Sequence, residues 1–219
     1  MITVLWLVSA LSALVYGALW VLGPVSALRT VVKMVPVAAL ALIAYLTGPQ
    51  QGLALLLPAA LALSAVGDGF LAGNPKRWLP LGLASFLIAH LIYVALFWSA
   101  GGPSGLSEPV RLALIMAAPI GGVGMLAWLW PHLGAMRGAV SAYVAAIVAM
   151  LATSLLLPWK AWPVMVGAAA FMASDAILSA DLFRSARLAA SERLSGYAIW
   201  GLYYGGQAAI ALGLMRLDL

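Results

Sequence analysis

Long apolar stretches, separated by turn-forming residues, recur along the whole chain. A membrane-spanning helix needs about 20 consecutive, mainly apolar residues. Stretches that reach this length cover residues 2–22, 27–46, 53–72, 78–98, 109–130, 138–157, 161–183 and 195–215. Breakers such as Gly23-Pro24 and Thr47-Gly48-Pro49 lie between them. The pattern predicts an all-α membrane protein with eight transmembrane helices, which form a single polytopic domain over residues 1–219.

The composition agrees with a membrane protein and narrows its chemistry. The chain is 65% hydrophobic and 8% charged, which excludes a soluble globule. Its net charge of +5 does not indicate a nucleic-acid partner, because the basic residues lie between the apolar stretches. With no cysteine and only two histidines, disulfides, thiolate metal sites and a three-histidine zinc site are excluded. We therefore expect no metal and no cofactor.

The basic residues are distributed unequally between the two sides of the predicted bundle. The side that holds the loops after the first, third, fifth and seventh stretches carries Arg29, Lys33, Lys76, Arg77, Arg137, Arg184, Arg187 and Arg193. The other side carries only Arg111, Lys160 and Arg216. Cytoplasmic loops are enriched in Lys and Arg. This asymmetry predicts that both termini lie outside the cytoplasm, in a multi-pass protein of the cell (inner) membrane.

Five polar residues lie inside the predicted spans: Lys33, Asp68, His90, Asp175 and Gln207. An ionisable side chain in a membrane helix costs several kcal/mol, so each one is a functional hypothesis. A rise of about 1.5 Å per residue places all five in the cytoplasmic half or near the centre. This shared depth predicts one polar cavity that opens toward the inner leaflet. Hydroxyl and aromatic neighbours at helical spacing accompany them: Ser64, Phe86, Tyr93, Tyr203 and Tyr204.

Structural roles would also explain some of these residues. Lys33 would pair with Asp68 to hold two helices together, His90 would donate to a backbone carbonyl, and Gln207 would bond to a neighbouring helix. Two carboxylates on separate helices are more than packing needs. Asp68 and Asp175 are therefore the strongest functional candidates.

A faint internal repeat relates the two aspartates. Residues 66–72 (VGDGFLA) are similar to residues 173–179 (ASDAILS), and each segment ends the third helix of a four-helix half. Two parallel halves about an axis along the membrane normal would bring Asp68 and Asp175 to one central site, as in repeat-built transporters.

Several motifs occur in a fixed order from the second predicted helix to the eighth. They are Lys33 with Pro36; Ser64, Gly67, Asp68 and Leu71; Gly82, Phe86, Ala89, His90 and Tyr93; Val140, Tyr143 and Met150; Gly167, Phe171, Ser174, Asp175, Leu178 and Phe183; and Tyr203, Tyr204 and Gln207. This ordered set resembles the YhhN-like family of integral-membrane lysoplasmalogenases. One departure is Met34, which stands where the family is expected to have a proline.

The resemblance implies a hydrolase that cleaves the vinyl ether bond of lysoplasmalogens. The products would be a fatty aldehyde and glycerophosphoethanolamine or glycerophosphocholine. The lysophospholipid would come from the cytoplasmic leaflet, and water and membrane lipids would be the other partners. The catalytic residues implied are Asp68 and Asp175, and the substrate-binding residues implied are Lys33, Ser64, His90, Tyr93, Ser174, Tyr203, Tyr204 and Gln207.

Vinyl ether hydrolysis suits a pair of carboxyl groups. The bond has no electrophilic carbonyl for a serine nucleophile, and it breaks after a proton is delivered to the enol carbon. One carboxylic acid must stay protonated near neutral pH, while a second carboxylate stabilises the oxocarbenium ion or orients water. Asp68 and Asp175 would supply both groups. Lys33 would keep one of them ionised or bind the phosphate.

A small secondary transporter is the alternative hypothesis. The two aspartates would then be proton or cation sites between two four-helix halves. Against this, residues 118–122 (APIGG) form the only strong Gly/Pro break in the middle of a span. The carboxylates also lie away from the predicted midplane. The sequence leaves the head group, the chain length and the oligomeric state open.

Overall fold

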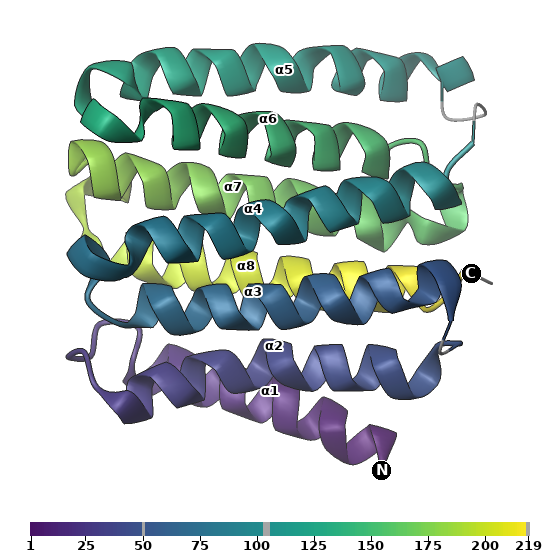
Figure 1. Ribbon diagram of the computed structural model, residues 1–219, viewed down its shortest axis with the longest axis horizontal. Helices are drawn as coiled ribbons and strands as arrows, with labels where there is room; N and C mark the ends of the chain where they lie inside the picture. The colour runs from purple at the N-terminus through teal and green to yellow at the C-terminus, as the bar shows by residue number, and fades with distance from the viewer. Residues whose placement is uncertain (50, 103–105, 218–219) are drawn as a thin grey trace.

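The computed structural model describes residues 1–49, 51–102 and 106–217, and these residues are mostly helical. Their α-helices are α1 (Ile2–Leu19), α2 (Ala27–Thr47), α3 (Leu56–Ala72), α4 (Pro75–Ala100), α5 (Pro109–Leu129), α6 (Arg137–Ser154), α7 (Trp162–Arg184) and α8 (Glu192–Leu214). Short 3-10 turns join some of them, and these residues contain no strand. The helices lie side by side along the long axis of the molecule (Figure 1). The predicted all-α class is thereby confirmed.

Seven of the helical segments within the described ranges are long and apolar enough to cross a membrane. The exception is α8, which has 23 residues but carries tyrosines, glycines and Gln207, which lower its mean hydropathy. In lipid, each backbone polar group must be satisfied within the segment, so helices of this kind span the membrane. The chain is therefore a multi-pass membrane protein. Eight spanning helices remain a prediction.

Several helix ends differ from the sequence-based expectation, and at two of them local hydrogen bonds give the reason. The first helix was expected to reach residue 22, but it ends at Leu19, and the N–H groups of Trp20 and Val21 both bond to the carbonyl of Tyr16. The last helix begins at Glu192, three residues earlier than expected. There the Ser191 side chain caps the helix by accepting a hydrogen bond from a backbone N–H.

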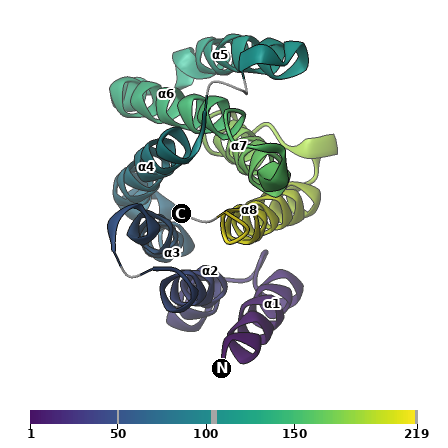
Figure 2. The same ribbon diagram turned by 90° about the vertical axis from the view of Figure 1, so that its right-hand side faces the viewer.

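Six helices form a ring, and two lie outside it. Around the ring, α2, α3, α4, α6, α7 and α8 each pack on the next, and α8 returns to α2. Outside the ring, α1 packs on α2 and α8, while α5 packs on α6 and α7 (Figure 2). In this order α1 and α5 have equivalent places, as do α2 and α6, and α3 and α7. Such an order is compatible with two parallel four-helix halves, which stay a prediction.

The closest approach between ring helices is that of α7 and α8. A Cβ atom added at Gly167 of α7 would lie 2.6 Å from the carbonyl oxygen of Gly206 of α8. In the reverse direction, a Cβ at Gly206 would lie 2.8 Å from the carbonyl oxygen of Gly167. Small residues at such crossings allow membrane helices to pack backbone against backbone. The pair of glycines therefore sets the distance between α7 and α8.

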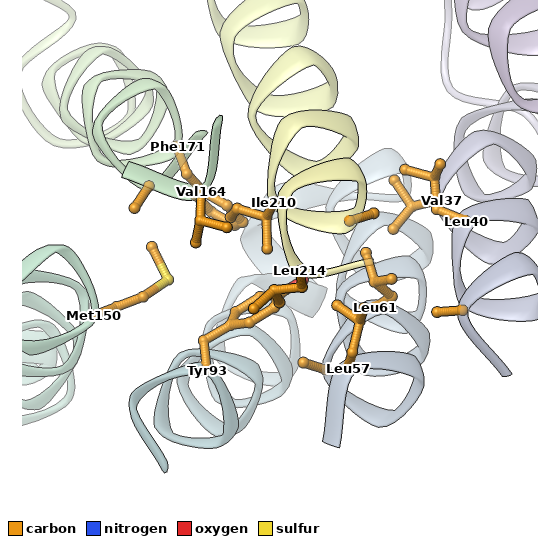
Figure 3. Close-up of a cluster of buried hydrophobic side chains, with 14 of the residues drawn as sticks. Val37, Leu40, Leu57, Leu61, Tyr93, Met150, Val164, Phe171, Ile210 and Leu214 are labelled. Carbon is orange, nitrogen blue, oxygen red and sulfur yellow. The ribbon is translucent and has the colours of Figure 1, made fainter. Parts of the chain in front are cut away.

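The two ends of the ring differ. At the end where α1, α3, α5 and α7 finish, on the left in Figure 1, lie Arg29, Arg77, Arg137, Arg184 and Arg193. We call this the basic end; the side chain of Lys76, predicted to belong to it, is outside the described part. Toward the opposite end the ring is filled by a hydrophobic core (Figure 3), to which belong Val37, Leu40, Leu57, Leu61, Tyr93, Met150, Val164, Phe171, Ile210 and Leu214.

Candidate active site

A cavity of about 320 Å³ opens at the basic end, between α1, α2, α3, α7 and α8, with two residues of α4 completing its wall. We call it the polar cavity. Its polar and aromatic lining includes Tyr16, Arg29, Lys33, Asp68, Ser174, Asp175, Asp181, Glu192, Trp200 and Tyr203. At its rim, Asp181 and Glu192 both pair with the exposed Arg187, at 2.8 and 3.3 Å. The remaining charged side chains of its lining, Arg29, Lys33, Asp68 and Asp175, therefore come from α2, α3 and α7.

Asp68 lies in the last turns of α3 and is 1% exposed. Its Oδ1 atom is 3.4 Å from Nζ of Lys33 on α2, and its Oδ2 atom accepts a 2.5 Å hydrogen bond from the Tyr203 hydroxyl on α8. The preceding residue is Gly67, and only a glycine fits at this position without displacing Phe86, since a Cβ atom there would lie 2.6 Å from the Phe86 ring. Asp68 is thus a buried carboxylate held by a cation and a phenol.

Asp175 occupies the corresponding place on α7, about two turns before the helix ends. Its Oδ2 atom accepts a 2.5 Å hydrogen bond from the Tyr143 hydroxyl on α6. Among the described residues, no Lys or Arg nitrogen forms an ion pair with it. Both aspartates line the polar cavity, but only Asp68 has a cation against it. The ammonium group of Lys33 therefore balances the charge of Asp68, while Asp175 has no ion-pair partner in the described part of the chain.

A second cavity of about 340 Å³ lies beside the first, between α3, α4, α5, α6 and α7. We call it the apolar cavity, because its only polar side chains are Tyr143, Asp175 and Ser179. The two cavities share the lining residues Leu71, Leu79, Phe86, Asp175, Leu178 and Leu182. Asp175 therefore lies at the junction of the two cavities, whereas Asp68 lines the polar cavity alone.

The structure brings half of the sequence-predicted site residues to the polar cavity. Those that line it are Lys33, Asp68, Ser174, Asp175 and Tyr203. The others line neither cavity: Ser64, His90, Tyr93, Tyr204 and Gln207. Of these, Ser64 donates to the carbonyl of Ala60 in its own helix, at 2.9 Å, and the Tyr204 hydroxyl bonds to Ser9 of α1, also at 2.9 Å.

His90, Tyr93 and Gln207 form a buried group behind the carboxylates. The Tyr93 hydroxyl donates to Oε1 of Gln207 at 2.6 Å, which links α4 to α8. The His90 ring packs edge-on against Tyr143 at 5.0 Å and Phe171 at 4.8 Å between ring centres. Both His90 nitrogens and Nε2 of Gln207 have no hydrogen-bond partner among the described residues. Of these residues, His90 thus contacts Tyr143, the tyrosine that donates to Asp175.

Two residues of the site were absent from the sequence-based set. Tyr143, which donates to Asp175, is a motif residue but was not among the predicted site residues; its place as the only tyrosine of α6 is the signal that could have found it. Arg29 lines the polar cavity and stands four residues before Lys33. Residues four apart share a helix face, which is the signal that could have found Arg29.

Metal-ligating side chains do not gather anywhere in the described ranges: no group of three or more His, Cys, Asp or Glu lies close enough to hold an ion. The two carboxylates at the polar cavity are contacted instead by Lys33, Tyr143 and Tyr203. Ammonium and phenol groups donate to carboxylates and leave them available as acids and bases.

Two carboxylates that line a cavity inside a helical membrane bundle define an integral-membrane protein with a candidate acid–base site. The chain belongs to the YhhN family, which it matches over residues 28–214. The resemblance seen in the motifs is thereby confirmed. The matched segment begins in α2, so α1 lies outside it.

Similar proteins carry one functional name. A lysoplasmalogenase of Mycobacterium bovis is 33% identical over 157 residues, which are 70% of this chain and 58% of that protein. The human lysoplasmalogenase TMEM86B is 35% identical over 209 residues, which are 94% of this chain and 84% of that protein. The chain thus spans little more than half the length of the mycobacterial relative. No solved structure matches this chain.

Proposed function

We propose that this protein is a lysoplasmalogenase, which hydrolyses the vinyl ether bond of lysoplasmenyl-ethanolamine or lysoplasmenyl-choline. The observation that carries the proposal is the pair of carboxyl groups at one cavity, of which only Asp68 has a cation partner. Two carboxyl groups in different environments are what acid catalysis by one and charge stabilisation by the other require. The names of the mycobacterial and human relatives support the same activity.

Asp175 is the proton donor in this mechanism. Its carboxyl group gives a proton to the carbon of the double bond that lies on the chain side, and the double-bond electrons form the new C–H bond. The other carbon becomes an oxocarbenium ion, which shares its positive charge with the ether oxygen. Asp68, kept ionised by Lys33, faces the same cavity and stabilises that charge.

Water completes the reaction. A water molecule adds to the oxocarbenium carbon and returns a proton to the Asp175 carboxylate, which gives a hemiacetal and restores the acid. The hemiacetal then breaks its bond to the glycerol oxygen. That oxygen takes up the hydroxyl proton, and the products are a fatty aldehyde and the glycerophospho-alcohol. The sequence is balanced with water alone, so it uses no cofactor and no metal.

Some of the remaining predicted residues would touch the lipid directly, and the others would act through neighbouring side chains. Lys33, Ser174 and Tyr203 line the polar cavity and would contact the head group or glycerol. Ser64, His90, Tyr93, Tyr204 and Gln207 would act through their neighbours. For example, His90 packs on Tyr143, which in turn donates to Asp175. The carboxyl groups then keep their orientation while the lipid enters and leaves.

The vinyl ether itself supplies the test of the activity. Purified protein in detergent should release aldehyde from lysoplasmenyl-ethanolamine and no fatty acid from its ester analogue, because an ester has no enol carbon that can accept the proton. Aldehyde release should be unchanged after exhaustive chelation. Activity abolished by chelator and restored by zinc would contradict the metal-free mechanism. No aldehyde release, together with proton-coupled uptake in vesicles, would replace the proposal by the transporter alternative.

We place the protein in the cell (inner) membrane, with α8 as an eighth span. In the proposed orientation the basic end faces the cytoplasm and both termini lie outside. The lysolipid would then reach the cavities from the cytoplasmic leaflet. A reporter fused after Leu219, which lies outside the described residues, should report the outer side. A reporter inserted in the loop of residues 185–191 should report the cytoplasm. A cytoplasmic C-terminus would overturn both the orientation and the leaflet.

A further inference from the structure

The apolar cavity is as large as the polar one, yet Asp175 is the only one of its lining residues that reacts in the mechanism above. Its walls are formed by side chains such as Leu83, Met125 and Ile147, from α4, α5 and α6. Its volume of about 340 Å³ falls within the range of ligand pockets, roughly 300–1,000 Å³. A space of this size, whose walls carry only three polar side chains among many apolar ones, does not hold ordered water well. Its occupant should therefore be a hydrocarbon.

The position of the cavity indicates which hydrocarbon this is. The apolar cavity meets the polar cavity along six shared residues, and Asp175 is the only carboxyl group among them. A molecule that fills both cavities has a charged part beside Arg29 and Lys33, an apolar part against α5, and Asp175 at the point where the two parts join. A lysolipid with one unbranched chain has this division.

We infer that the single hydrocarbon chain of the substrate occupies the apolar cavity between α4, α5, α6 and α7, and that the face of α5 at Gly121 determines which chain lengths are accepted. The inference rests on the proposed function, since it places the chain of the same lipid. It also agrees with the role of Asp175 as acid. The carbon that receives the proton is on the chain side of the ether oxygen, and Asp175 is the aspartate that lines the chain's cavity.

Gly121 offers a direct way to change the cavity. It lines the apolar cavity, and a Cβ atom built on it meets no other atom within 4 Å. A larger side chain at this position therefore fits the backbone and projects into free space. Gly124, one turn further along α5, also has nothing within 4 Å of its Cβ position, but it lines neither described cavity. The Gly124 variants are matched controls.

The test compares chain lengths in the Gly121→Phe and Gly124→Phe variants. For lysoplasmenyl-ethanolamine with chains of about 18 and about 10 carbons, Gly121→Phe should lower the ratio of kcat/KM values, long over short, by about tenfold. That is the effect of preventing the burial of about two methylene groups. Gly124→Phe should leave the ratio unchanged. Gly121→Leu should give a smaller shift of the ratio in the same direction. It replaces Gly121→Phe in the test if the Phe variant does not fold.

The outcome separates this inference from the proposed function. If the wild-type protein releases aldehyde but Gly121→Phe and Gly121→Leu keep its chain-length ratio, the chain lies elsewhere and the inference is wrong. If the wild type releases no aldehyde at all, the proposed function fails. The cavity is then tested by thermal stabilisation with non-cleavable alkyl-ether lysolipids. Stabilisation that grows with chain length in the wild type and the Gly124 variant, but not in Gly121→Phe, supports the chain site, and equal stabilisation in all three overturns it.

Discussion

Replacing either aspartate by asparagine should lower the turnover of lysoplasmenyl-ethanolamine by at least about a hundredfold, the usual contribution of a general acid or base. Asparagine keeps the shape of the side chain, but it cannot donate a carboxyl proton or carry a negative charge. Asp175→Asn removes the proposed acid. Asp68→Asn removes the negative charge proposed to face the oxocarbenium ion, and it leaves Lys33 as an uncompensated cation 3.4 Å away.

Three further measurements separate catalysis from folding. The double variant should lose little more activity than either single variant, because residues that act as a unit are not additive. The wild-type rate should show a solvent deuterium isotope effect if proton transfer to carbon limits it. Glu108→Gln is the control, since Glu108 bonds to Trp159 at the end opposite the cavities and should keep full activity. Near-normal aldehyde release from a folded single variant would remove that aspartate from the mechanism.

Gly206→Ala should destabilise the protein by about 1–3 kcal/mol, the usual cost of overpacking a tight contact. Its Cβ would lie 2.8 Å from the carbonyl oxygen of Gly167, and backbone atoms cannot rotate away as a flexible side chain can. The neighbouring Gly205 has nothing within 4 Å of its Cβ position, so Gly205→Ala is a matched control one residue away. Thermal unfolding in detergent measures both variants.

The same substitution should also reduce activity. Gly206 lies one turn after Tyr203 on α8, so moving α8 away from α7 displaces the hydroxyl that donates to Asp68. Loss of both stability and turnover in Gly206→Ala, with neither lost in Gly205→Ala, is the expected pattern. Equal unfolding temperatures for the two variants would contradict the close crossing of α7 and α8.

The helices were predictable because the membrane leaves few choices. Apolar stretches of about 20 residues must satisfy their backbone groups within themselves, so length and hydropathy located every long helix to within a few residues. The order of packing around the ring was not predictable in the same way. The contact of α4 with α6, and of α2 with α8, depends on which faces of nearly uniform apolar helices fit together.

The carboxylates were predictable for a related reason, since a charge inside an apolar helix is costly and must have a partner. The sequence therefore identified Asp68, Asp175 and Lys33 before their contacts were known. Depth alone did not show which residues face the cavity. His90 was expected in the same polar cavity as the carboxylates, but its ring packs among aromatic side chains and does not line that cavity. No sequence pattern indicated the apolar cavity, because in the sequence a leucine that lines a cavity cannot be distinguished from one that faces lipid.

The position of α5 outside the ring has a consequence for kinetics. One wall of the apolar cavity belongs to α5, which packs mainly on α6 and α7 in the described part of the chain, so the proposed chain site would border the acyl layer of the bilayer rather than the ring interior. A substrate chain that slides in from the membrane exchanges one hydrocarbon surrounding for another, with almost no change in hydration. Rates should then follow the mole fraction of lysolipid in the membrane surface, and dilution with inert lipid should slow the enzyme even when the bulk concentration is constant.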